Sequence, residues 1–379
     1  MLLQPPLNSD FLVSTQAGKY VSPTLKVYED ENVQIVDGVC LQVVHKGSQS
    51  RLAQPFMSEN IKLTKSFLPA VDDICKVKAP IIYYGLFIDI WHGQYPNKWS
   101  DLCHWCDTFF NLMSAARLNV FESLTHIFMW QVQRSQWKEH EFHNAILNSV
   151  LEASNTQNIT LVFDEDIKNG SFWFFQRIAA SRFIPRKLSQ YSTHFTGCSR
   201  GFKHVSDRLF YRNMLMSRYQ FKESKIKSVL YLQRPRVLLE NEDSLKRYVE
   251  SKKYVWKQYT FTKKIPFREQ FKQVSTSRIM ISSHGANMVY MVFMPRFSAV
   301  VEILNCKYHS FMYGNLAMNS NIFHSQVYAS DVCSNVSNTI NTRMFMNNRI
   351  KISTQRFYNA IDFSTRYVNF ALKYEKTLE

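Results

Sequence analysis

A short apolar run followed by a glycine turn constrains the fold of this 379-residue chain more than any other stretch. Residues 278–282 have the pattern of a buried strand, and His284-Gly285-Ala286 then interrupts it. Asn287 to Met294 returns to apolar residues at helical spacing, and Ser298 to Ile303 predicts a second strand. Together these segments predict a βαβ unit of a parallel sheet, with the turn at the carboxyl edge of the sheet.

The turn of this unit predicts a binding site for a phosphorylated ligand. The first amides of the helix, from Gly285 to Asn287, have no partner within the helix and attract phosphate. Glu302 ends the next strand, where a carboxylate can accept hydrogen bonds from ribose hydroxyls. The same spacing also fits a purely structural turn at His284 and an ordinary strand end at Glu302. The residues alone leave both interpretations open.

The neighbouring segments extend the alternation of strands and helices. Strands are expected over Ile226 to Leu232 and Tyr254 to Phe261, and helices from about Asn241 and over Pro266 to Val274. Arg234 and Arg236 directly follow the first of these strands. The planar donors of a guanidinium suit diphosphate oxygens, and the sequence leaves open which of the two arginines has this role.

A second candidate site lies in the first half of the chain. Ser100 suits the N-cap of a helix in which His104 and Asp107, three residues apart, share one face. A histidine and a carboxylate presented together can act as a general base and its orienting partner, although an exposed polar face fits the same pattern. Cys103 and Cys106 lie beside them, but no second pair of ligands follows, so we expect no zinc site.

Composition limits the partners of the chain. A hydrophobic content of 45% indicates a folded protein, and the length suits two domains. The net charge of +16 indicates an anionic partner, but the lysines and arginines form no basic run, so the charge does not favour nucleic acid. A nucleotide-sugar diphosphate would also suit it, although such a ligand needs only a few of these residues. Residues 79–91 are too short an apolar run to span a membrane, and no signal peptide is visible at the start. Glycosylation sequons at Asn158, Asn169 and Asn335 favour a secretory lumen.

The motif Ser282-Ser283-His284-Gly285-Ala286, with Met294-Pro295 and Val300-Val301-Glu302-Ile303 after it, resembles the signature of glycosyltransferase family 61. The segment His104-Trp105-Cys106-Asp107, with an apolar strand ending at Trp130 after it, is similar to the family members that modify EGF-like domains. From about Asp73 to Tyr328, the motifs of this chain occur in the same order as in those family members. One departure is Pro295-Arg296-Phe297, where the family usually has Pro-Gly or a similar small turn.

This resemblance implies an α/β protein with two Rossmann-like domains that face a cleft, the GT-B type. The expected parts are an N-terminal extension or a part of the first domain (1–72), an acceptor-side domain with a linker helix (73–224), a UDP-sugar domain (225–353) and a terminal helix that packs back on the first domain (354–379).

The resemblance also implies an inverting enzyme of the endoplasmic reticulum lumen that transfers GlcNAc from UDP-GlcNAc to Ser or Thr of EGF-like domains. Asp107 would be the base and His104 its orienting partner. Arg234 or Arg236, with the His284 to Asn287 turn, would bind the diphosphate, and Glu302 the ribose. No tightly bound cofactor is expected, and manganese is not expected to be essential. Asp164-Glu165-Asp166 resembles an acidic loop that binds manganese, but a solvated turn fits the same residues. Two alternatives stay open. The chain could be another family member, which transfers xylose or GlcNAc to a glycan, or a catalytically inactive relative that acts as a binding protein.

Overall fold

The structure is a computed structural model in which the chain forms two compact units. It describes residues 25–28, 33–46, 49–52, 81–89, 125–130, 134–139, 144, 147–148, 159–166, 172–181, 205–224, 226–234, 237–262, 264–305, 312–329 and 348–375. The described residues up to 181 belong to the first unit, and those from 205 onward to the second. Within these ranges, no helix has both the length and the apolar character needed to cross a membrane.

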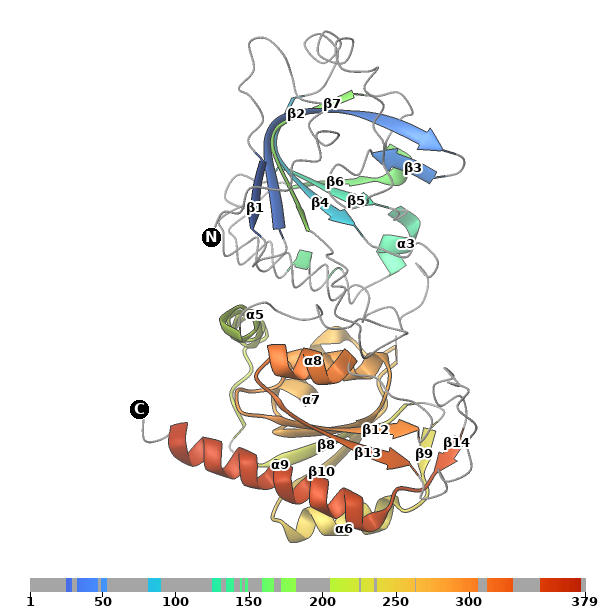
Figure 1. The fold of residues 1–379 in the computed structure, drawn as a ribbon, viewed down its shortest axis with the longest axis vertical. Helices are drawn as coiled ribbons and strands as arrows, with labels where there is room; N and C mark the ends of the chain where they lie inside the picture. The colour runs from blue at the N-terminus through green and yellow to red at the C-terminus, as the bar shows by residue number, and fades with distance from the viewer. Residues whose placement is uncertain are drawn as a thin grey trace. The chain divides into compact units, whose positions relative to one another are not determined.

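The first unit contains a mixed sheet of seven strands (Figure 1). Its order is β1 (Leu25–Tyr28), β2 (Val33–Lys46), β7 (Phe172–Ser181), β4 (Ile81–Asp89), β5 (His126–Trp130) and β6 (Thr160–Phe163), and β3 (Gln49–Leu52) pairs with β2. Strands β7, β4, β5 and β6 are parallel, whereas β1 to β3 and the β2–β7 pair are antiparallel. Helix α3 (Arg134–Glu139) and a 3₁₀ turn, η5 (Asp164–Asp166), follow β5 and β6.

The second unit is built on a fully parallel sheet of five strands. Its order is β10 (Val255–Tyr259), β8 (Ser228–Leu232), β11 (Ile279–Ser283), β12 (Ala299–Asn305) and β13 (Phe323–Ala329). In chain order this arrangement reads 2-1-3-4-5, and the direction of winding reverses between β8 and β11. Such a switch point opens a crevice at the carboxyl ends of the strands, where open α/β sheets bind ligands. The expected Rossmann-like alternation is therefore confirmed for this unit.

Helices cover both faces of the second sheet (Figure 1). Helices α6 (Glu242–Ser251) and α9 (Thr354–Glu375) lie on one face, and α7 (Phe267–Ser275) and α8 (Met312–Asn319) lie on the other. Since side chains alternate along a strand, Val301 and Ile303 enter the core beneath α9, whereas Val300 and Glu302 point to the opposite face. A small parallel pair, β9 (Val237–Leu239) with β14 (Asn348–Ile350), precedes α9.

The segment after β11 differs from the expected α-helix. It forms a 3₁₀-helix, η7 (Ala286–Phe293), in which every residue from Asn287 onward is buried. The Met288 amide donates to the Gly285 carbonyl at 2.9 Å, which is an i to i+3 bond. Because η7 is buried on all sides, it needs no single apolar face. The spacing of its apolar residues therefore could not distinguish a 3₁₀-helix from an α-helix.

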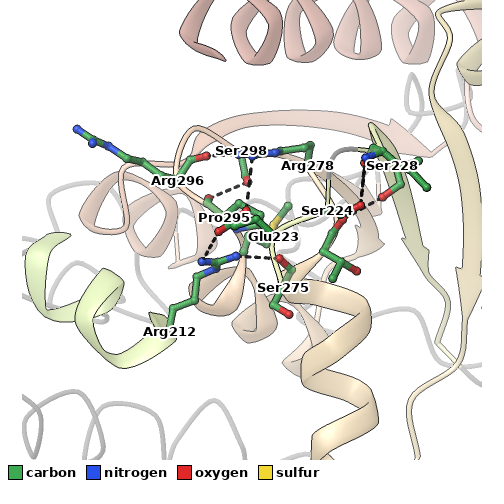
Figure 2. A network of polar contacts seen from close by, with 12 residues as sticks. Arg212, Glu223, Ser224, Ser228, Ser275, Arg278, Pro295, Arg296 and Ser298 are labelled. Atoms are coloured by element: carbon green, nitrogen blue, oxygen red, sulfur yellow. Dashed lines mark hydrogen bonds and ion pairs between the residues drawn. The ribbon is translucent and has the colours of Figure 1, made fainter. Parts of the chain in front are cut away.

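Helix α5 (Val205–Arg218) is attached to the end of η7 by two buried arginines. Arg208 Nη1 donates to the carbonyls of Val292 and Met294, at 3.2 and 2.7 Å. Arg212 Nη2 donates to Ser275 O at 2.9 Å, and its Nη1 lies 2.7 Å from Glu223 (Figure 2). The expected contact of the terminal helix with the first domain stays a prediction, because α9 is described here on β12 and β13 of its own sheet.

The turn before β12 retains the geometry of a small-residue turn without a glycine. Phe297 has φ of 58°, in the left-handed region that glycine adopts without strain. The turn is held by Ser298 Oγ, which donates to Pro295 O at 2.8 Å, and by Arg278 Nη1, which donates to Arg296 O at 2.8 Å (Figure 2). Side-chain bonds thus hold a left-handed residue that is not glycine in this turn.

Candidate functional site

The candidate site lies at the switch point of the second sheet, where the loops after β8 and β11 meet. Arg234 follows β8 and His284 follows β11. Arg234 Nη1 donates to the backbone carbonyl of His284 at 2.8 Å. Burial lowers the pKa of Arg234, while the nearby Tyr313 raises it. An arginine remains charged at neutral pH despite such burial, so the switch point carries a fixed cation.

Gly285 allows this arginine to lie against the turn. Its φ is 150°, a conformation that residues with a side chain rarely adopt. A Cβ at this position would lie 2.8 Å from Arg234 Nη1 and 3.0 Å from Arg234 Cζ. The guanidinium therefore occupies the space that any other residue would fill.

The turn presents backbone amides without partners. The His284 amide donates to Ile303 O at 2.8 Å, and the next backbone bond comes from Met288, which donates to Gly285 O. Among the described residues, the amides of Gly285, Ala286 and Asn287 therefore have no acceptor. Ser283 Oγ, directly before the turn, is buried and likewise lacks a partner within the described part of the chain. Unpaired amides at a helix start attract anions, so an anionic group of a ligand suits this turn.

Glu302 forms the centre of a buried cluster next to the turn. Its side chain is 0% exposed, and its Oε1 lies 2.5 Å from His284 Nδ1. Its Oε2 lies 2.8 Å from His324 Nε2 and accepts from Gln326 Nε2 at 3.1 Å. Burial alone would raise the pKa of Glu302, but the hydrogen bonds from His284 and His324 outweigh it and lower the pKa to about 2. The carboxylate is thus charged at neutral pH.

One aromatic ring packs against the cluster, and the charge of the cluster acts on a second tyrosine. The Tyr313 ring packs edge-on against the His284 ring, with 4.9 Å between the centroids. Burial, followed by the charge of Glu302, raises the pKa of Tyr328. The Tyr313 ring thus covers one side of His284 and, with Glu302, fixes the orientation of its ring.

The structure brings most of the expected donor-site residues together. Arg234, His284, Gly285, Ala286 and Asn287 lie at the carboxyl edge of the second sheet, after β8 and β11. Glu302 lies in the middle of β12, beside Ser282 in the parallel register, rather than at the strand end that the sequence predicted. Both oxygens of Glu302 are already hydrogen bonded, so its direct bond to a ribose hydroxyl stays a prediction. Arg236, His104 and Asp107 lie outside the described residues, and their roles stay predictions as well.

Sequence reasoning missed the two residues that β13 contributes. Gln326 lies opposite Glu302 in the parallel register of β12 and β13, and His324 lies two residues earlier on the same face. Spacing two residues apart on a strand signals a shared face. The neighbouring strand and its register, however, are tertiary facts that no local pattern in the sequence contains.

The first unit has a cavity of about 650 Å³, and none of its lining residues belongs to the switch-point site. It is lined by His126, Arg134, Trp137, Thr160, Leu161, Val162, Phe163 and Asp166. Arg134 Nη2 lies 2.7 and 2.6 Å from the two oxygens of Asp166, and the Arg134 amide donates to Glu165. The acidic loop is thus paired with an arginine, and the described residues contain no group of three or more His, Cys, Asp or Glu that could hold a metal ion.

Comparison with known proteins adds to this geometry. Residues 102–301 match the family described as Glycosyltransferase 61, which is more than half of the chain. The chain is also 26% identical over 212 residues to a protein of Drosophila melanogaster, the EGF domain-specific O-linked N-acetylglucosamine transferase. That match covers 54% of this chain and 38% of the relative. The matched family region contains the Arg234 loop and the whole His284 turn.

Proposed function

The chain belongs to glycosyltransferase family 61, and from that membership we propose that it transfers a sugar from a nucleotide-sugar donor held at the switch point of its second sheet. The observation that carries this proposal is the contact of Arg234 with the Gly285 turn. It places a fixed cation beside backbone amides that lack acceptors among the described residues. Such a pair of donor groups suits the two phosphates of a nucleoside diphosphate.

In this proposal the turn and the arginine also stabilise the leaving group. As the bond between the sugar and the diphosphate breaks, negative charge develops on the diphosphate oxygens. Hydrogen-bond donors that are already in place stabilise this developing charge more than water does, because they need no reorganisation during the reaction. Arg234 and the amides of Gly285 to Asn287 would supply these donors, with Arg236 as a second candidate. A manganese ion would then be an aid rather than a requirement.

The acceptor side of the proposal rests on the family resemblance. The two units would face a cleft in the GT-B arrangement, with Asp107 as the general base and His104 orienting it. Asp107 would take the proton from an acceptor hydroxyl while the oxygen of that hydroxyl bonds to the anomeric carbon of the sugar. The nucleoside diphosphate would leave from the opposite side, so the configuration inverts.

The finer identity of donor and acceptor is proposed from the fruit-fly relative. Its name indicates transfer of N-acetylglucosamine to EGF domains, so we propose UDP-GlcNAc as donor and Ser or Thr of EGF-like domains in the secretory lumen as acceptor. The chain covers only 38% of that relative, and the two therefore share part of their length. The alternatives are a different sugar or a glycan acceptor, and an inactive relative that binds without turnover.

Thermal protection by UDP tests the donor site. A ligand that binds only the native state at 100 times its Kd raises the free energy of unfolding by about 2.7 kcal/mol, so UDP should raise Tm. Arg234→Ala should weaken this protection, whereas Arg247→Ala, an exposed arginine on α6, should leave it unchanged. An absent shift for the wild type at millimolar UDP would contradict the donor site. Measuring UDP release with each UDP-sugar then separates the alternatives, because an inactive relative releases none.

A further inference from the structure

Two histidines from different elements share the buried carboxylate of Glu302. His284, from the turn after β11, contacts Oε1, and His324, from β13, contacts Oε2. Gln326 adds a third donor, also on Oε2. Each oxygen therefore has its own imidazole, and the carboxylate links β13 to the turn.

The contacts continue from Glu302 to the donor-binding groups. The His284 ring is held by Glu302, and the His284 backbone carbonyl accepts from Arg234 Nη1 at 2.8 Å. The next residue is Gly285, against which the guanidinium lies. A continuous series of contacts thus runs from His324 through Glu302 and His284 to Arg234.

The arrangement costs free energy that a packing role does not explain. A carboxylate buried at 0% exposure is expensive unless donors compensate it, and filling this position of β12 by packing alone would need no charge. His324 is also not needed to fill the core, since its ring is only partly buried. The buried charge of Glu302 instead acts on the turn after β11, through its contact with His284.

We propose that His324 is a positioning residue of the donor site, one that fixes Glu302 so that His284 holds Arg234 and the Gly285 turn in the geometry that binds a diphosphate. The proposal rests on the proposed function, because it concerns the same nucleotide site. His324 itself touches no ligand in this scheme. It acts on affinity for the diphosphate through two intervening side chains.

The test compares two replacements of similar size. His324→Gln keeps an N–H that can donate to Glu302, whereas His324→Met keeps the volume and loses the donor. Ser325→Ala is the control, because Ser325 lies on the same strand and its Oγ donates to Val300 O rather than to Glu302. Kd for UDP and for uridine is measured for each variant by ligand-observed NMR, and cooperative thermal unfolding shows that each variant folds.

We expect His324→Met to weaken UDP binding roughly tenfold, the order associated with losing one hydrogen bond to a charged group. In this scheme both oxygens of Glu302 stay bonded to protein groups rather than to the ribose. Uridine binding, which needs no diphosphate contacts, should therefore stay within about twofold, as should UDP binding by His324→Gln and Ser325→Ala. In an Arg234→Ala background, His324→Met should cause no further loss beyond about twofold, because both changes act through one series of contacts.

The outcomes separate this inference from the proposed function. A wild type that does not bind UDP overturns both. A wild type that binds UDP while His324→Met binds it equally well overturns the positioning role and leaves the proposed function standing. Equal losses for UDP and uridine, or full additivity with Arg234→Ala, also overturn it, since they indicate general loosening. If His324→Met does not fold, Gln326→Met removes a donor from the same oxygen and is judged by the same measurements.

Discussion

At the scale of single residues, the candidate site depends on a charge held in a place where charges are costly. Glu302 is fully buried in β12, and its free energy of desolvation is offset by donors from His284, His324 and Gln326. Removing one donor therefore affects the others, because they share one carboxylate. This coupling makes the cluster sensitive to protonation.

Glu302 should make the stability of the chain depend on pH in the acid range. Its pKa in the folded state is lowered to about 2 from 4.5, so its contribution is fully present above pH 4.5 and is lost as the pH falls towards 2. Urea unfolding between pH 2 and 7 should show a loss of a few kcal/mol across this window for the wild type, on the order expected for such a shift. Glu302→Gln should be less stable at pH 7 but flatter in the acid range.

The matched control is Glu250→Gln, which changes an exposed carboxylate on α6. It should keep the acid dependence of the wild type. If the unfolding free energies of Glu302→Gln and the wild type run parallel from pH 7 to pH 2, the carboxylate is not held in its charged form by the two histidines.

At the scale of elements, the sequence predicted the alternation of the second unit but not its arrangement. Local periodicity was enough to identify β8, β10, β11 and β12, because apolar runs and breaks are local properties. The switch point between β8 and β11 depends on strand order, and the contact of His324 with Glu302 depends on register across β12 and β13. Both are set by packing of distant segments, so no single segment of the sequence contains them.

The turn between β11 and η7 should tolerate no side chain. Gly285→Ala would place a Cβ 2.8 Å from Arg234 Nη1 at a φ of 150°, so the arginine or the turn must move. We expect a loss of about 1–3 kcal/mol in the free energy of unfolding, the range for a strained backbone position, together with weaker UDP binding. Chemical denaturation and UDP titration measure the two effects.

Gly314→Ala is a suitable control for the predicted loss of stability. Gly314 lies within helix α8, and a Cβ there would meet only His324, at 3.4 Å. Because alanine favours a helix over glycine by roughly 0.5–1 kcal/mol, this variant should be as stable as the wild type or slightly more stable. Equal behaviour of the two alanine variants would show that the Gly285 position is not special.

At the scale of the whole molecule, the proposed reaction divides between groups that bind the donor and groups that activate the acceptor. The second unit has its own core, formed by its sheet with α6 and α9, and contains every described residue of the donor site. Donor binding should therefore depend on this unit alone. Activation of the acceptor is proposed for Asp107, on a segment outside the described residues.

Loss of the base should separate turnover from donor binding. A general base contributes about 10²–10⁴-fold to rate, so Asp107→Asn should lower kcat by that factor while UDP raises Tm as in the wild type. Glu250→Gln is the control, because Glu250 is an exposed carboxylate on α6 and has no part in the proposed reaction. His104→Ala should cost less than Asp107→Asn if the imidazole only orients the carboxylate. Near-full turnover of Asp107→Asn with unchanged UDP binding would place the base elsewhere, and Asp166, which lines the cavity of the first unit beside Arg134, would be the next residue to replace.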